Sequence, residues 1–220
     1  MNVLIACEES QRVCQMFRLK GHKVFSCDIL DTSGSHLEWH IKGNVLNIIN
    51  GYCNFHTEDN TFHIIDKWDL IIAFPPCTYL TVTGNRWFNV ERYGEKAIER
   101  CNKRINAIKF FMEIANADCK KIAIENPVGI MSTTWKKPEQ IIQPYYFGDN
   151  ARKTTCLWLK NLPLLKPSNI VKPDIIKYKN GKGTDNPWHM NTMHLPSNER
   201  SILRSKTFPG IAKAMADQWG

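Results

Sequence analysis

Residues 68–77 read WDLIIAFPPC, an apolar run that stops at two prolines and a cysteine. A short apolar run bounded by a turn signal is typical of a strand buried on both faces, as in a parallel sheet. Proline fixes the backbone angle φ, so Pro75 and Pro76 should hold the thiol of Cys77 in one direction. The stretch therefore predicts a central strand with an ordered chemical group at its end.

Apolar runs of the same kind recur along the chain and alternate with helix-like segments. We expect strands at 2–6, 23–27, 121–124 and 154–159, and helices at 10–20, 91–117 and 209–219. This alternation predicts an α/β fold whose mainly parallel sheet is covered by helices on both faces. A chain of 220 residues is long enough for one well-buried domain, which we expect to span 1–220.

Two of these segments carry more detailed expectations. The long helix should turn one apolar face inward, formed by Ile98, Cys101, Ile105, Ile108, Met112 and Ala115. Residues 50–66 are polar and aperiodic, and we interpret them as an inserted loop. They include Cys53, His56 and His63 but no convincing fourth ligand for zinc, so we expect no metal site.

Composition and charge limit the class of protein. No apolar run approaches the ~20 residues that span a bilayer, and the eight cysteines form no CxxC pair. Both features favour a cytoplasmic protein with reduced thiols. The net charge is +8, and residues 152–182 hold eight lysines and arginines against one acid, Asp174. This basic segment indicates a polyanionic partner such as nucleic acid, bound through Lys172, Lys177, Lys179 and Lys182.

In parallel α/β sheets, ligands bind beyond the carboxyl ends of the strands. The turn after the first strand reads ACEES (residues 6–10), and Asp28 ends the second strand. An acid at that position commonly accepts hydrogen bonds from a ribose. Two carboxylates would repel a pyrophosphate but would suit a phosphate-free, cationic cofactor. These residues point to S-adenosylmethionine.

The chemical groups follow two other strands. A thiolate at Cys77 is a nucleophile suited to an electron-poor ring carbon, and Glu125 could hold the edge of a base. The residues 75–84 (PPCTYLTVTG) and Glu125-Asn126-Pro127 resemble the nucleophile loop and the Glu-Asn-Val motif of DNA cytosine carbon-5 methyltransferases. Weaker similarities to that family keep its order along the chain: LIACEE at 4–9, Asp28, Gly43-Asn44-Val45, residues 146–153 leading into CLWL, and 209–214.

The resemblance implies the Rossmann-like class I methyltransferase fold, with S-adenosylmethionine as cofactor and DNA or another pyrimidine-containing nucleic acid or nucleotide as partner. It implies that Cys77 adds to carbon 6 of cytosine, that Glu125 holds the ring nitrogen and amine, and that Arg152 assists. It also assigns a cofactor-binding set of Ala6, Cys7, Glu8, Glu9, Asp28, Ile29, Asn44, Val45, Pro75 and Pro76.

The chain departs from the family pattern in several places. The ACEES turn replaces Phe-x-Gly-x-Gly, and Asn44 replaces an acid. Lys153 and Thr154 interrupt an arginine pair, so only Arg152 is carried over. Fewer than fifty residues separate Leu159 from Thr207, and the basic segment 152–182 stands where a target-recognition domain would be. Such compactness resembles phage-encoded members, which act in the host cytoplasm.

Three other functions remain open from the sequence. The substrate could be a free nucleotide, the donor could be a modified adenosyl compound, or the chain could bind nucleic acid or cofactor without turnover. Methyltransferases that act on amino nitrogens need Asp, Asn or Ser before the two prolines. Here that residue is Phe74, which argues against them.

Overall fold

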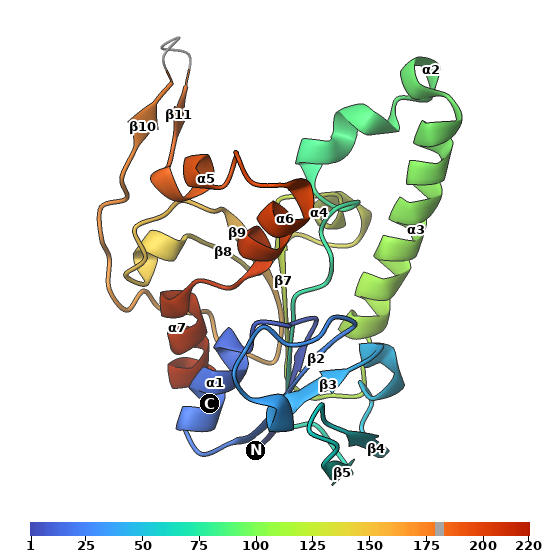
Figure 1. Cartoon of the computed structure of the whole chain (residues 1–220), viewed down its shortest axis with the longest axis vertical. Helices are drawn as coiled ribbons and strands as arrows, with labels where there is room; N and C mark the ends of the chain where they lie inside the picture. Colours follow the sequence, from blue (N-terminus) through green and yellow to red (C-terminus); the bar gives the residue numbers. More distant parts are fainter. Residues whose placement is uncertain (179–182) are drawn as a thin grey trace.

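The computed structural model describes residues 1–178 and 183–220 and is built on one seven-stranded sheet (Figure 1). Its strands lie in the order β3 (His40–Lys42), β2 (Lys23–Asp28), β1 (Asn2–Ala6), β6 (Leu70–Ala73), β7 (Ile122–Pro127), β9 (Thr155–Lys160) and β8 (Gln140–Ile142). The first five are parallel, whereas β9 runs antiparallel to both β7 and β8. This is the predicted α/β fold, with a Rossmann-like and mainly parallel sheet.

Helices cover both faces of the sheet, as the sequence predicts. On one face, α3 (Glu95–Ala115) buries Phe111 and Ile114 against β1, β6 and β7. On the other, α1 (Arg12–Leu19) and α7 (Pro209–Trp219) pack together. Because successive strand residues point to opposite faces, each central strand contributes to both cores.

The predicted inward face of the long helix is partly wrong. Ile98 and Ile105 are 50% and 51% exposed, whereas Ala97 is fully buried. The physical reason is position: the amino-terminal half of α3 extends past the edge of the sheet, where no strand can cover it (Figure 1). This half, together with the 3-10 helix η3 (Val82–Phe88) and the short helix α2 (Val90–Tyr93), forms a projecting arm.

Residues 50–66 are not an aperiodic loop, which corrects the prediction. They form an antiparallel hairpin of β4 (Cys53–His56) and β5 (Phe62–Ile65). The hairpin buries Phe55 and Ile65 in the same core as Phe25. The apolar alternation is short and mixed with histidine and asparagine, so it gives little signal in the sequence. The described residues include no cluster of three metal-ligating side chains.

The remaining elements lie near the carboxyl edge of the sheet or beside it. They are η1 (Leu37–Trp39), η2 (Val45–Asn47), α4 (Met131–Thr134), η4 (Pro144–Tyr146), β10 (Ile176–Lys177), β11 (Thr184–Asp185), α5 (Pro187–Asn191) and α6 (Ser197–Ser205). The β10–β11 hairpin projects on the side opposite the α3 arm, and α6 lies between the two (Figure 1). Within the described residues, no helix combines the length and the apolarity needed to cross a membrane.

Candidate active site

The order of strands reverses between β1 and β6, and this switch point is where parallel sheets open a crevice for ligands. The two strand ends are joined there, because the Phe74 amide donates to the Ala6 carbonyl at 2.9 Å. Predicted cofactor residues follow β1, and the predicted nucleophile loop follows β6. The fold therefore brings the two predicted halves of the site to one edge.

The nucleophile loop is fixed to the neighbouring strand β7 by Asn126. This side chain is 2% exposed, and its amide donates to the Pro75 carbonyl at 2.8 Å. Beyond the prolines, the amides of Leu80 and Thr81 both donate to the Cys77 carbonyl at 2.9 Å. These contacts give the backbone at Cys77 a defined position relative to β7.

A second attachment follows Cys77 in the chain. The Ile130 amide donates to the Leu80 carbonyl at 2.8 Å, and Thr81 forms a bridge with Gly129. A Cβ atom at Gly129 would lie 2.3 Å from the Leu80 carbonyl oxygen, closer than real contacts allow. Only glycine fits at this close approach of two backbones. The loop is thus held to the β7 segment both before and after the thiol.

Glu125 lies inside β7 rather than just beyond a strand end, opposite Leu157 of β9. The sequence predicted a strand ending at residue 124, but β7 continues to Pro127 because β9 pairs with it throughout. Burial raises the pKa of the Glu125 carboxyl, while the charge of Lys153 and a hydrogen bond with Thr155 oppose that shift. Its protonated form is therefore favoured compared with a free glutamic acid.

Cys77 is the exposed member of the eight cysteines. The protein around the thiol raises its pKa by desolvation, and the Glu125 carboxylate adds to this. Lys153 acts in the opposite direction by favouring the thiolate. The charges of Glu125 and Lys153 therefore both act on the Cys77 thiol, and these three residues make up the candidate chemical end of the site.

The structure brings Lys153, and not Arg152, beside these two residues. The Arg152 guanidinium donates to the Thr184 hydroxyl at 3.1 Å and so points toward the β10–β11 hairpin. The family resemblance assigns Arg152, and not Lys153, to the site. The sequence does contain a signal for Lys153, because residues two apart in an extended chain point to the same face. Lys153 stands two residues before Thr155, and Thr155 contacts Glu125.

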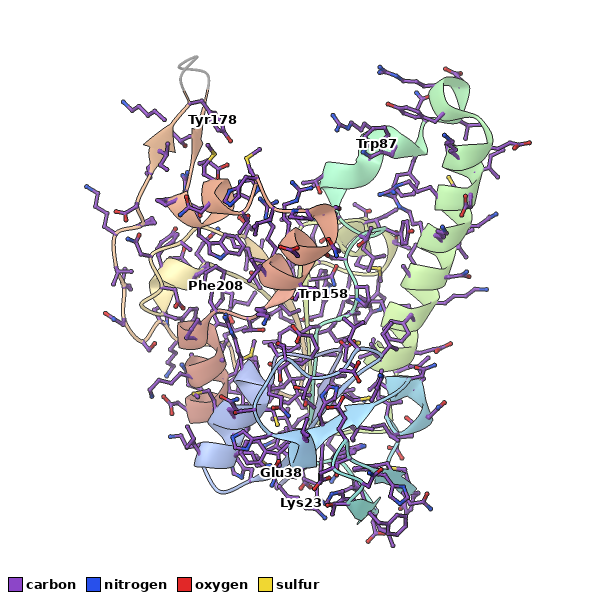
Figure 2. All side chains as sticks on the ribbon, viewed as in Figure 1. Lys23, Glu38, Trp87, Trp158, Tyr178 and Phe208 are labelled. Carbon is purple, nitrogen blue, oxygen red and sulfur yellow. The ribbon has the colours of Figure 1, made fainter. Side chains whose placement is uncertain are left out.

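A small cavity of about 10 Å³ separates Glu125 and Lys153 from the segment joining α6 to α7. Its lining is Phe74, Glu125, Lys153, Thr155, Thr207, Phe208 and Ile211. That volume is enough for about one water molecule. The segment is attached to the cofactor side, because the Arg12 guanidinium donates to the Thr207 carbonyl at 2.8 Å. Figure 2 shows Phe208 at the carboxyl edge, beside α7.

At the cofactor end, the two predicted glutamates differ in role. Both oxygens of Glu8 accept backbone amides that begin α1, from Val13 at 2.7 Å and Cys14 at 3.2 Å. Burial nevertheless raises the pKa of Glu8 to about 7. One oxygen of Glu9 accepts the Ser33 amide at 3.1 Å, while Oε1 is buried and has no hydrogen-bond partner within the described residues. Its nearest cation, Lys206, lies 3.8 Å away.

The other predicted cofactor residues lie at the ends of β1 and β2, shortly after β6, and at the start of η2. Ala6 is buried and Cys7, with φ of 59°, turns the chain out of β1. Asp28 ends β2 as predicted, accepts the Leu30 amide at 3.0 Å, and has its pKa raised by burial.

The remaining predicted cofactor residues differ in exposure. Ile29 is 73% exposed, whereas Val45 belongs to the core. The exposed Asn44 side chain accepts the Leu46 amide at the start of η2. Pro75 is buried and Pro76 exposed.

Of the four predicted nucleic-acid residues, the structure describes two, and these lie away from the groups above. Lys172 and Lys177 are exposed on the extended chain and hairpin that follow β9. Lys179 and Lys182 fall outside the described residues. A larger hollow of about 480 Å³ lies between η2 and α3, but it is lined by none of the predicted site residues.

The sequence matches no protein-family model and no curated protein. Among solved structures, the chain is similar to a candidate DNA modification methyltransferase encoded within a prophage, from E. coli. The sequence identity is 15% and the TM-score 0.42, with 80% of this chain covered. This chain spans 56% of the length of that one. Because the TM-score is below 0.5, the likeness bears on neither substrate nor activity.

Proposed function

We propose that this protein is a methyltransferase that uses S-adenosylmethionine to methylate carbon 5 of cytosine in DNA through a covalent adduct with Cys77. The observation that carries the proposal is the meeting of Cys77, Glu125 and Lys153 at the switch-point edge. An exposed thiol, a carboxyl of raised pKa and a cation are the groups that nucleophilic addition to a pyrimidine requires.

Each group has a distinct task in this chemistry. The Cys77 thiolate forms a bond to carbon 6, and the electron pair of the ring double bond becomes available at carbon 5. Glu125, whose pKa is raised by burial, donates a proton or hydrogen bond to the ring nitrogen and balances the charge that the addition creates there. Lys153 favours the thiolate. Once carbon 5 carries the methyl group and the donor sulfonium is left as a neutral thioether, loss of the carbon 5 proton to water and cleavage of the Sγ–C6 bond restore the double bond and release the Cys77 thiolate.

The residues at the ends of β1 and β2 fit the proposed cofactor. Glu9 Oε1 is a buried acceptor without a hydrogen-bond partner in the described chain, and an amino group would satisfy it. Asp28 can accept from ribose hydroxyls, and Ile29 and Leu30 offer exposed apolar surface beside it. S-Adenosylmethionine would supply an electrophilic methyl group on a sulfonium centre. Glu8 holds α1 in place rather than facing the ligand.

The decisive experiment traps the adduct. DNA containing 5-fluorocytosine should form a covalent complex with the protein in the presence of S-adenosylmethionine, because fluorine cannot leave as a proton does. Cys77→Ser should lose the adduct and turnover while still binding cofactor. Cys53→Ser, on the distant β4 strand, is the matched control and should keep both. Methylation of cytosine by Cys77→Ser at the wild-type rate would overturn the mechanism.

The cofactor assignment has its own test. Asp28→Ala removes charge-assisted hydrogen bonds worth about 1.5–3 kcal/mol, or roughly a 10- to 100-fold weaker Kd for S-adenosylmethionine. Asp31→Ala is the control, since this exposed acid three residues later pairs with Lys42. Titration calorimetry measures both. Equal affinities in the two variants would exclude Asp28 from the pocket.

A further inference from the structure

The arm formed by η3, α2 and the first half of α3 carries aromatic rings together with arginines. Trp87 is 42% exposed, and its ring centre lies 5.1 Å from that of the half-buried Tyr93. Arg86 lies over the Trp87 ring at 4.7 Å, and Arg92 over the Tyr93 ring at 5.5 Å. Both arginines are exposed. Figure 2 shows Trp87 on this arm and Tyr178 on the opposite projection.

This aromatic pair does not serve the packing of the core. Neither ring belongs to the buried clusters, because the arm extends beyond the sheet. A large exposed aromatic side chain is therefore available to a partner. Residues 82–104 hold six lysines and arginines against three glutamates, so the partner should carry negative charge. Aromatic faces interleaved with cations are the pattern that stacks bases and neutralises phosphates.

The arm is also joined to the candidate nucleophile. Arg104 donates from Nε to the Tyr79 carbonyl at 2.8 Å, and its guanidinium lies over the Phe88 ring. Arg100 donates to the Thr78 carbonyl at 3.2 Å and lies over the same Phe88 ring. Thr78 and Tyr79 follow Cys77 directly. A strand held at Trp87 would thus lie on the element that continues from the nucleophile loop.

We propose that Trp87 and Tyr93, with Arg86 and Arg92, form a stacking platform for the unpaired bases of a single DNA strand next to the target cytosine. This assignment rests on the proposed function for its position beside Cys77. Bases in a duplex are already stacked on one another, so their faces are not available to these rings. The platform therefore favours single-stranded over double-stranded DNA.

The test separates strand binding from methyl transfer by using an oligonucleotide without cytosine. Fluorescence anisotropy with labelled (dT)12 should show tighter binding than to the (dT)12·(dA)12 duplex. Trp87→Ala should weaken (dT)12 binding about tenfold, as expected for loss of one stacked base. Trp87→Leu keeps the apolar bulk without the π face and should weaken it similarly. Tyr52→Ala is the matched control, because this 84% exposed tyrosine lies near the hairpin of β4 and β5.

Each possible result decides the assignment. Wild-type (dT)12 affinity in both Trp87 variants would overturn the platform, and so would an equal loss on duplex and single strand. Tighter binding of (rU)12 than of (dT)12 would overturn its assignment to DNA. If Trp87-dependent (dT)12 binding is found while cytosine-containing DNA is never methylated, the platform stands and the proposed function fails.

Discussion

The buried Asn126 amide donates to the Pro75 carbonyl at 2.8 Å and so joins β7, which carries Glu125, to the turn that carries Cys77. Two residues that are far apart in the chain thereby set the relative position of the proposed nucleophile and the proposed acid. The same amide also donates to the Glu125 carbonyl at 3.1 Å. Asn126 is thus a positioning residue.

Replacing Asn126 should separate positioning from chemistry. Asn126→Ala leaves the Pro75 carbonyl without this donor and should cost about 1–3 kcal/mol of unfolding free energy. We also expect slower adduct formation with 5-fluorocytosine DNA at unchanged cofactor affinity. Urea unfolding and gel-resolved adduct kinetics measure these effects. Asn161→Ala is the control, since this exposed amide donates to Lys120 at the other end of the β7–β9 pair. Equal effects of both variants would contradict a specific role for Asn126.

Lys153 should govern the reactivity of Cys77. Removing the cation in Lys153→Met raises the pKa of the thiol, so less thiolate is present at a given pH. Alkylation of Cys77 by iodoacetamide at pH 8 should slow by about threefold or more, while Lys153→Arg keeps the charge and most of the rate. Peptide mass spectrometry resolves Cys77 from the other cysteines. Arg152→Met should leave the alkylation rate of Cys77 unchanged. A slower rate in Arg152→Met than in Lys153→Met would instead favour Arg152, the residue that the sequence suggests.

Glu8 should make stability depend on pH. Its folded pKa of about 7 lies above the ordinary value, so the folded state binds the proton more tightly than the unfolded chain. The contribution of this group is therefore fully present below about pH 4.5 and is lost as pH rises toward 7. The expected loss is about 3 kcal/mol. Urea unfolding should show that the free energy of unfolding falls less between pH 5 and 8 in Glu8→Gln than in the wild type. Identical pH dependence in the two proteins would argue that Glu8 stays ionised.

The exposed lysines after β9 should contact phosphates and carry little sequence information. If Lys172 and Lys177 each neutralise one duplex phosphate, replacing both by alanine should flatten the slope of log affinity against log salt by about 1.8. Anisotropy with a duplex between 50 and 200 mM salt measures this. Lys20→Ala with Lys213→Ala removes the same charge from the carboxyl end of α1 and from α7, where both lysines pair with Asp217. An equal flattening in this control pair would mean that net charge alone is responsible.

The sequence by itself determined the parallel α/β sheet, because its apolar runs and helical periods are local patterns repeated at regular spacing. It also singled out Cys77, Glu125 and Asp28 as candidates, since prolines and acids directly after or within an apolar strand stand out without knowledge of contacts. Tertiary structure decided what depends on neighbours. Lys153 rather than Arg152 lies beside Glu125 because the chain entering β9, whose Thr155 pairs with Pro127 of β7, directs Lys153 toward Glu125 and Arg152 toward Thr184. Ile98 and Ile105 are exposed because α3 extends past the sheet, and helical periodicity carries no information on where a sheet ends.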